Sequence, residues 1–434
     1  MNNLNYNKIF DQLFPICRSI TGDGFRKSLK ILSRFFNFKI ERFKSGKKIF
    51  DWIVPYEWNI SDAYILQNKK KIVDFKKNNL HVVNYSHSIN KILNLDQLKR
   101  NLFTIKKYPK YIPYVTSYYK KSWGFCLQYE KFKKLRHGRY KVFINSELKK
   151  GFVEYGISKL KGNSKKIMLL TTYLCHPTMA NNELSGPLVL LGLYEKIKRW
   201  KKKNLNYYFL INPETIGSIC FLSKYKELLK KNLQSGLVLT TLGGPRKILS
   251  YKKSRIGNSS LDRLFTYFKN RGNCLTREFN PAEGSDERQY CSSELNLPVG
   301  QVTRTKYYDY PQYHTSGDTK KFMQMKQIDR SVDFLYKILE INDMIFPLKR
   351  YQPFCELQLG KRDLFPNINF YHGLKLPSDK KRDSRKQLNL LLYILSYADG
   401  NHDILDLAIK TGIHVEKFLK ILRLAINKKL IKHL

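Results

Sequence analysis

Several features of membrane and secreted proteins are missing from this sequence. No stretch of its 434 residues approaches the roughly 18 uninterrupted apolar residues of a membrane-spanning helix. The first residues, MNNLNYNKIFDQLF, lack the basic segment followed by an apolar segment that marks a secretory signal. CxxC pairs are absent, and the odd number of 7 cysteines fits reduced thiols better than a disulfide framework. We therefore expect a cytoplasmic globular protein without a membrane span.

Acidic residues are scarce, because 35 Asp and Glu stand against 80 Lys and Arg, for a formal net charge of +45. Such a charge attracts nucleic acid or another polyanion when the basic residues form a patch. Here the lysines are spread over the whole length, with runs at 69–71 and 201–203 among them. This distribution favours a generally basic, solvated surface over a dedicated polyanion site.

Residues 151–350 alternate short apolar runs with amphipathic helical segments, which predicts an α/β domain with a mainly parallel, doubly wound sheet. Strands are expected at 166–174, 206–212, 235–242 and 297–303, and helices at 185–200, 217–232 and 260–270. Ligand-handling residues of such sheets lie in loops beyond the carboxyl ends of the strands. His176, Glu214 and Gly243 occupy such positions.

The region before this domain has a different pattern. Residues 1–45 begin with a helical segment that is broken by Pro15 and by the turn TGDG. Residues 46–150 are rich in aromatic and β-branched residues and are punctuated by turns. They predict a smaller β-rich domain inserted ahead of the α/β domain.

Residues 380–434 follow a polar stretch at 376–387 that is expected to be a linker. They contain three segments of helical period separated by ADGN and TGIH, an arrangement typical of a helix-turn-helix. The third segment places Lys417, Lys420, Arg423 and Lys428 on its polar side. Binding of DNA phosphates and contact with another protein are both open for this unit.

Four loop clusters contain the ionisable groups that metal-dependent hydrolysis requires: CHPTMANNELSG, NPETIGS, EGSDERQYC and YHTSGDT. Their side chains at the expected strand ends are His176, Glu214, Asp286 and His314. Imidazole and carboxylate together suit zinc, whose catalytic sites use about three protein ligands and leave a position for water. A metal-bound water ionises near neutral pH, and a nearby carboxylate can accept its proton.

The order of these clusters resembles the M28-type zinc aminopeptidases, with their H, D-x-x-S-G, E-E-x-G, S-D and Y-H-T-x-x-D-T segments. Further segments, including PICRSITGDGFRKSL, WIVPYEWNISDAYI and IPYVTSYYKKSWGFC, resemble more closely the bacterial polysaccharide biosynthesis proteins with an aminopeptidase-like domain. The resemblance covers nearly the whole chain. It implies an aminopeptidase-like domain that includes residues 1–45, an inserted β-rich domain and a C-terminal winged-helix unit, while the substrate is not implied.

The resemblance also implies roles for individual residues. His176 and Asp286 match ligands of one zinc ion, and His314 matches a ligand of a second. Glu214 matches the general base. Two further positions depart from the superfamily, because Asn182 stands where an aspartate bridges the ions and Thr215 stands where a second acid would join His314.

Asn182 has chemical consequences. A bridging carboxylate gives an anionic oxygen to each of two ions, whereas asparagine offers one neutral carbonyl oxygen. One zinc ion held by His176, Asp286 and His314, with Asn182 as a weak further ligand, is the simplest alternative to two ions. Glu183 could replace the missing carboxylate if the next helix began one residue later. A third possibility is that the polar residues bond to one another and hold no metal.

Other residues are weaker candidates for contact with substrate. Arg18, Arg288 and Arg304 could bind a carboxylate or phosphate through paired guanidinium contacts, or could brace loops. GGPR at 243–246 follows an expected strand but lacks the full spacing of a phosphate loop.

The leading expectation is a zinc-dependent hydrolase of amide or peptide bonds that acts on a small peptide or an aminoacyl- or sugar-linked substrate. One alternative is a catalytically reduced relative that binds such a ligand, and another is a regulator that uses its helix-turn-helix to bind nucleic acid. A homo-oligomer is compatible with each.

Overall fold

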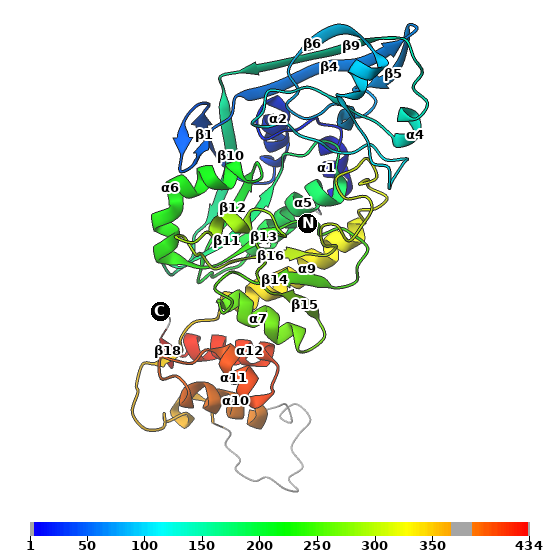
Figure 1. Cartoon of the computed structure of the whole chain (residues 1–434). Coiled ribbons are helices and arrows are strands. Elements are labelled where there is room, and N and C mark those ends of the chain that lie inside the picture. The colour runs from blue at the N-terminus through cyan, green and yellow to red at the C-terminus, as the bar shows by residue number, and fades with distance from the viewer. Residues whose placement is uncertain (1–3, 366–383, 433–434) are drawn as a thin grey trace. The chain divides into compact units, whose positions relative to one another are not determined.

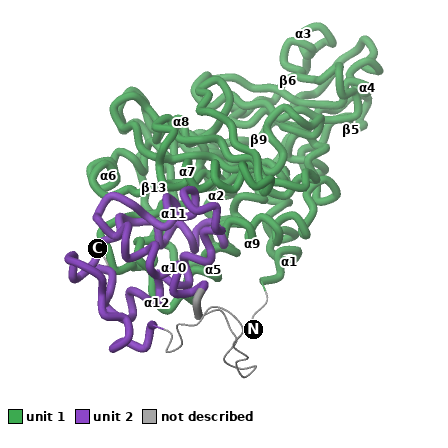
Figure 2. Tube along the Cα trace, turned by 90° about the horizontal axis from the view of Figure 1, so that it is seen from below, with its two compact units in different colours: residues 1–336 green, residues 337–434 purple. Residues whose placement is uncertain are grey.

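The computed structural model describes residues 4–365 and 384–432 and contains two compact units, Met1–Tyr336 and Lys337–Leu434 (Figure 2). Most of the linker expected at 376–387 lies outside the described residues. Within the described ranges, no helix is both long and apolar enough to cross a membrane.

The first unit is organised around an eight-stranded mixed sheet in the order β1-β10-β12-β11-β13-β16-β14-β15 (Figure 1). The central strands β12, β11, β13 and β16 are parallel, as the sequence pattern predicts. All residues of β11 are buried, since helices cover both faces of a sheet of this kind. The strands are β1 (Lys39–Lys44), β10 (Phe152–Leu160), β11 (Ile167–Tyr173), β12 (Asn206–Asn212), β13 (Leu233–Leu239), β14 (Leu249–Lys252), β15 (Cys274–Arg277) and β16 (Val299–Thr303).

Helices cover the two faces of this sheet. On one face, Phe221 of α6 (Ile216–Asn232) shares a core with Leu169 of β11. On the other, α5 (Ser185–Lys198) lies so close to β11 that a Cβ at Gly186 would be 2.1 Å from Thr172 Oγ1. Leu169 and Thr172 point to opposite faces because they are an odd number of residues apart. The doubly wound arrangement is therefore confirmed, with α1 (Tyr6–Leu13), α2 (Asp23–Leu32), α7 (Ser260–Lys269), α8 (Glu287–Tyr290) and α9 (Met325–Asn342) as further helices.

The chain between β1 and β10 contains a second, antiparallel sheet in the order β5-β4-β9-β6 (Figure 1). It has its own core, in which Ala63, Ile65, Val142 and Ile144 are buried. Its strands are β4 (Glu57–Gln67), β5 (Lys70–Asp74), β6 (Ile89–Asn94) and β9 (Arg139–Lys149). Shorter elements accompany it: β2 (Lys48–Ile49), β3 (Trp52–Ile53), η1 (Asn79–His81), α3 (Leu95–Lys99), β7 (Leu102–Phe103), β8 (Phe125–Cys126) and α4 (Tyr129–Phe132).

The second unit contains the three helices that the sequence predicts, α10 (Ser384–Ser396), α11 (Ile404–Thr411) and α12 (Val415–Asn427). Asp403 caps α11 with hydrogen bonds to the amides of Leu405 and Asp406, and Gly412 ends this helix with a φ of 71°. After α12, β18 (Ile431–Lys432) pairs with β17 (Lys349–Arg350), which lies before the helices in sequence. The unit also contains the short η3 (Gly360–Arg362).

Candidate functional site

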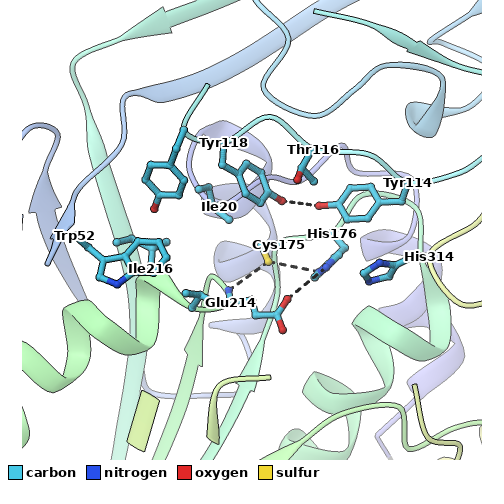
Figure 3. Close-up of a pocket in the computed structure, with 12 residues that line it drawn as sticks. Ile20, Trp52, Tyr114, Thr116, Tyr118, Cys175, His176, Glu214, Ile216 and His314 are labelled. Atoms are coloured by element: carbon cyan, nitrogen blue, oxygen red, sulfur yellow. Dashed lines mark hydrogen bonds and ion pairs between the residues drawn. The ribbon is translucent and has the colours of Figure 1, made fainter. Parts of the chain in front are cut away.

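The expected site residues lie in loops that follow the parallel strands. His176 comes after β11, Glu214 comes after β12, and His314 lies in the loop that follows β16. All three line one cavity of about 270 Å³ (Figure 3). The complete lining is Ile20, Trp52, Tyr114, Thr116, Tyr118, Tyr119, Cys175, His176, Glu214, Thr215, Ile216 and His314.

The spacing of these three side chains fits a shared cation. His176 Nε2 lies 3.6 Å from Glu214 Oε2, and the rings of His176 and His314 have centroids 5.3 Å apart. Zinc–nitrogen and zinc–oxygen bonds of about 2.1 Å in a tetrahedral site place neighbouring ligand atoms ~3.4 Å apart. The Nε2 of His176 and the carboxylate of Glu214 are therefore separated by about the distance that two ligands of one zinc ion require.

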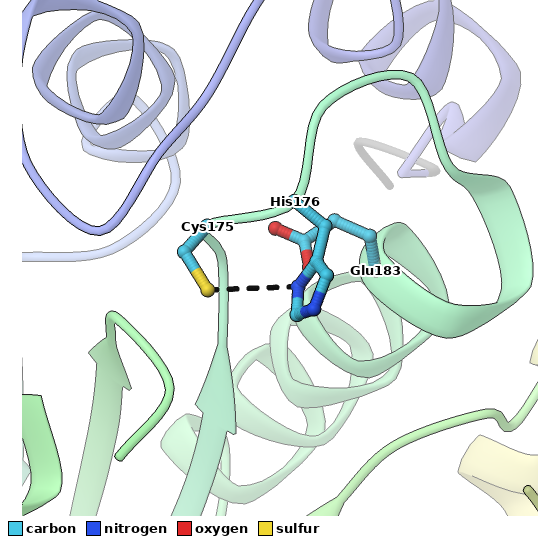
Figure 4. A group of neighbouring side chains, drawn as sticks. All are labelled: Cys175, His176 and Glu183. Carbon is cyan, nitrogen blue, oxygen red and sulfur yellow. Dashed lines mark hydrogen bonds and ion pairs between the residues drawn. The ribbon is translucent and has the colours of Figure 1, made fainter. Parts of the chain in front are cut away.

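The other nitrogen of His176 is held from behind (Figure 4). Its Nδ1 lies 2.8 Å from Glu183 Oε2, and the Cys175 Sγ is 3.5 Å away. Two ligands of one metal do not approach to 2.8 Å, so His176 and Glu183 form a hydrogen bond rather than a chelate. Arg18 Nε lies 3.6 Å from the second oxygen of Glu183 and donates to the His176 carbonyl oxygen at 3.1 Å.

This buried arrangement shifts the pKa values of the two histidines in opposite directions. Burial alone would lower the pKa of His176, but the adjacent Glu183 carboxylate outweighs it, so the pKa of His176 is raised. Burial and then the charge of His176 lower the pKa of His314 well below its usual value. The neutral imidazole of His314 is the form that binds a metal.

The loop after β11 ends in a π-helical turn, η2 (Ala180–Leu184), which leads directly into α5. Asp318 holds its first turn, because its carboxylate accepts from the amides of Asn181 at 2.7 Å and Asn182 at 2.8 Å. Glu183 projects from this turn toward His176, not into the cavity (Figure 4). It therefore orients the histidine.

Asn182 and Asp286 stand behind the cavity lining of the described chain. The Asn182 Oδ1 accepts from the Tyr173 hydroxyl at 3.2 Å, and its buried Nδ2 has no partner among the described residues. The carboxylate of Asp286 accepts from the Thr215 amide at 2.7 Å and from Asn212 Nδ2 at 3.0 Å.

Asp286 and Glu214 are close enough to repel each other. Burial, and then the charge of Glu214, raise the pKa of Asp286 to about 7. Ser285 donates from its Oγ to Glu214 Oε1, which leaves Oε2 facing His176. Between the two acids Thr215 adopts a φ of 64°, a strained conformation for a β-branched residue that points its amide at Asp286.

The three candidate arginines do not converge on the cavity in the described chain. Arg18 is fully buried behind Glu183 and His176. Arg288 is exposed and donates to the Ser285 carbonyl oxygen at 3.3 Å. Arg304 braces loops through carbonyl oxygens of Leu242, Arg246 and Lys247, and it lines a different cavity.

Aromatic residues of the inserted region form one wall of the cavity, which the sequence analysis did not anticipate. Tyr114 contacts the rings of His176 and His314 at centroid distances of 5.0 and 5.3 Å, and it exchanges a hydroxyl hydrogen bond with Tyr118 (Figure 3). The Tyr114 amide donates to the His314 carbonyl oxygen at 2.8 Å. The aromatic run YIPYVTSYY was the only signal for this wall.

Comparison with protein families matches both parts of the chain. Residues 7–344 match a family described as a domain of unknown function (DUF4910), and residues 347–433 match a winged helix-turn-helix family. The second match includes β17 and β18 as well as the three helices.

Related proteins extend this picture. The chain is 40% identical over 420 residues to a Clostridium acetobutylicum protein described as a candidate polysaccharide biosynthesis protein with an aminopeptidase-like domain, covering 95% of this chain and 92% of that one. A crystal structure of a candidate peptidase from Clostridium acetobutylicum superimposes with a TM-score of 0.85 and 36% identity over 98% of this chain and 95% of that one.

More distant structures share the fold. A zinc aminopeptidase from Bacillus subtilis matches with a TM-score of 0.57 at 12% identity, over 77% of this chain and 93% of that one. A peptidase M28 precursor from Shewanella amazonensis matches with a TM-score of 0.53 at 10% identity, over 78% and 92% of the two chains. The fold of the first unit is thus that of the zinc aminopeptidases. The chain belongs to the DUF4910 family, together with the Clostridium acetobutylicum protein described as having an aminopeptidase-like domain, and it carries a C-terminal winged helix-turn-helix.

Proposed function

We propose that the protein is a zinc-dependent hydrolase of amide or peptide bonds. The observation that carries this proposal is the convergence of His176, Glu214 and His314 on one cavity, with His176 Nε2 and Glu214 Oε2 3.6 Å apart. The likeness to zinc aminopeptidases at 10–12% identity supports only the fold, so the activity rests on these side chains.

The donor set fits one zinc ion better than two. His176, His314 and Asp286 would provide the three protein ligands that a catalytic zinc site uses, and Glu214 would remain free to act as the base. A second ion would need the anionic oxygens that neutral Asn182 and Thr215 do not supply. Burial, and then the charge of Glu214, raise the pKa of Asp286, as expected for two acids close together in a buried site.

When bound, zinc would supply a water of lowered pKa and polarise the carbonyl group of the substrate. Glu214 would accept the proton of that water, because its Oε2 faces the cavity while Ser285 holds its other oxygen. Glu183 would keep the Nε2 of His176 directed to the cavity through its hydrogen bond to Nδ1. Asp286 would hold the backbone next to Glu214 through the Thr215 amide.

The aromatic wall of the cavity favours a substrate with an apolar side chain or a sugar ring next to the bond that is cleaved. Trp52, Tyr118 and Tyr119 line the cavity, and aromatic faces of this kind pack against apolar side chains or sugar rings. We therefore propose a small peptide or an aminoacyl- or sugar-linked amide as substrate, which agrees with the polysaccharide pathway in the name of the relative. A cytoplasmic setting is part of the proposal, because the cysteines are free thiols.

Metal analysis of protein purified without chelators tests the proposal. We expect about one equivalent of zinc, lost in both His176→Ala and His314→Ala and retained in His137→Ala, which removes an exposed histidine of the inserted region. Hydrolysis of aminoacyl amides should disappear with the zinc. Protein that takes up no zinc even when it is supplied would refute the hydrolase.

A catalytically reduced, ligand-binding relative is the second candidate. It is favoured by Asn182, whose buried Nδ2 has no partner among the described residues where a bridging carboxylate would face two ions. Restoring the acid with Asn182→Asp separates the two. The reduced relative predicts that zinc content and hydrolysis rise together, whereas the single-zinc enzyme predicts little gain, since Thr215 stays neutral.

A regulator that binds DNA is the third candidate, favoured by the winged helix-turn-helix match. Lys417 and Lys420 are exposed on α12, and Lys428 is exposed directly after it. Arg423, however, lies 3.0 Å from Glu340 Oε1 of α9, so this part of the polar face is already occupied. The regulator predicts DNA binding with a steep salt dependence that Lys417→Gln and Lys420→Gln weaken, and unchanged binding would remove α12 as its source.

A further inference from the structure

A second cavity, of about 290 Å³, lies in the first unit over the β14–β15 edge of the main sheet. Its floor is the sheet face that carries Ser250 and Leu275, which are paired in register, and the opposite face packs against α7, where Tyr251 stacks on Phe265 with centroids 4.0 Å apart. The lining is Arg246, Ile248, Ser250, Leu275, Thr276, Arg277, Arg304, Lys306 and Asp309. Four of these residues are cationic and one is acidic.

Arg277 is held with its charged end free. Its Nε donates to Ser250 Oγ at 2.9 Å, which fixes the plane of the guanidinium group. Among the described residues, neither terminal nitrogen has an acceptor, and Nη2 is buried without a partner. A buried donor without an acceptor is costly, about 1–3 kcal/mol, unless a ligand satisfies it. An anchored guanidinium group with free terminal nitrogens suits the bidentate binding of an oxyanion.

Two further cations stand on the loops above this floor. Arg246 lies 3.1 Å from Asp309 Oδ2, and Lys306 lies 3.8 Å from Asp309 Oδ1 and 3.5 Å from Glu283. Asp309 thus serves as a shared counter-ion for two cations, and Arg277 is without one within ion-pair distance in the described chain. The cavity keeps excess positive charge.

Arg304 also lines this cavity, but its guanidinium group holds a loop in place. Its guanidinium nitrogens donate to the carbonyl oxygens of Arg246 and Lys247 at 2.9 and 2.7 Å, and to Ser331 Oγ at 3.0 Å. It therefore fixes the loop that presents Arg246, and only one N–H of its Nη2 remains without an acceptor among the described residues. Burial lowers the pKa of Arg304 to about 10, and the charge of Arg330 adds to this effect.

We propose that this cavity binds the phosphate group of a small phosphorylated ligand. The free end of Arg277, with Arg246 and Lys306, would surround a dianion, and 290 Å³ leaves room for a substituent of about the size of one sugar ring. A dianion is favoured over a carboxylate because three cations line this part of the cavity and only two acids, Asp309 and Glu283, pair with them.

The two cavities are separate but are joined by one loop. Arg304, Lys306 and Asp309 line the second cavity, and His314, further along the same loop, lines the first. The inference stands independently of the proposed hydrolase, because it uses none of the side chains assigned to zinc.

Calorimetric titration with inorganic phosphate, at constant ionic strength adjusted with chloride, tests the proposal. Saturable binding of one phosphate per chain is expected. We expect Arg277→Gln to weaken it at least tenfold and Arg246→Gln at least threefold. The matched control is Arg139→Gln, which removes an exposed arginine from the inserted region and should leave binding within twofold.

The same titration in His314→Ala protein excludes phosphate bound at a zinc site, and binding must persist there. Lys306→Gln, at a partly exposed side chain, decides the question with Arg246→Gln if Arg277→Gln does not fold. Absence of saturable binding, or equal weakening by Arg139→Gln, would overturn the site. Acetate binding as tightly as phosphate would overturn the assignment to a phosphate group.

Discussion

At the scale of single residues, His176 is not an isolated histidine at the end of a strand, because buried polar side chains hold its ring. Glu183 binds the Nδ1 of His176 and lies beside Arg18, so that three buried polar side chains act as one unit. A carboxylate that accepts from a metal-binding histidine fixes its ring and raises its basicity. The register of η2 places this carboxylate one residue after Asn182.

Replacing Glu183 by glutamine keeps the shape of this side chain but removes its charge. We expect Glu183→Gln to weaken zinc binding by about 10–100-fold, the usual effect of losing such a partner, without displacing His176. Competition with a zinc-chelating dye measures the change. Glu147→Gln, at an exposed glutamate on β9, is the control. Unaltered zinc affinity in Glu183→Gln would show that Glu183 does not orient His176.

The site residues were predictable to the extent that each follows a strand. His176, Glu214 and His314 meet at one cavity because the carboxyl ends of parallel strands share one edge of the sheet. The short apolar runs in the sequence predict these strands, and therefore predict that the residues after them lie close together. The aromatic wall was not predictable, because Tyr114 reaches the cavity from a chain segment about 60 residues earlier. No local pattern encodes that contact.

At the scale of elements, a buried ionic network joins the first helices to the inserted sheet. Arg26 of α2 contacts both oxygens of Glu57 at the start of β4, and lies 3.5 Å from Glu154 of β10. Burial raises the pKa of Glu57, but the hydrogen bonds from Arg26 outweigh it, so that the pKa is lowered overall. Three elements distant in sequence thus depend on one guanidinium group.

Arg26→Met is expected to reduce the free energy of unfolding by about 1–3 kcal/mol at pH 7, since it removes the cation paired with the buried Glu57 carboxylate, while Glu154 keeps Arg42. Because the folded-state pKa of Glu57 is lowered, this contribution is present above about pH 4.3 and is lost as the pH falls through the folded-state pKa. Urea unfolding at pH 7 and at about pH 3, well below the unfolded-state pKa, measures it. Lys27→Met, at an exposed residue of the same helix, should cost less than about 0.5 kcal/mol.

A loss from Arg26→Met that is the same at both pH values would contradict this account. The loss would then reflect the packing of the arginine stem and not its charge.

The central elements were easier to predict than the edges. The strands β11, β12, β13 and β16 are apolar runs, and the length and composition of these runs are enough to predict them as strands. The edge strand β15 and its neighbour β14 have only four residues each, which is too short for a periodic signal. Their position depends on pairing with β16 and packing on α7, which are long-range contacts.

At the scale of the whole molecule, the first unit places its two proposed histidine ligands and the proposed general base on loops from different strands of one sheet. His176 follows β11, Glu214 follows β12 and His314 lies beyond β16. A ligand bound only by the folded state stabilises it by mass action, about 2.7 kcal/mol at one hundred times its dissociation constant. Zinc should therefore stabilise the whole first unit and not one loop.

Removal of zinc by dialysis against a chelator is expected to lower the midpoint of the first unit's thermal transition by roughly 3–6 °C and to be reversed by added zinc. Calorimetry follows this transition apart from that of the second unit, which holds none of the proposed ligands. His314→Ala should start from the lower midpoint and show no response to chelator. A chelator effect that persists in His314→Ala would place the stabilising zinc elsewhere in the chain.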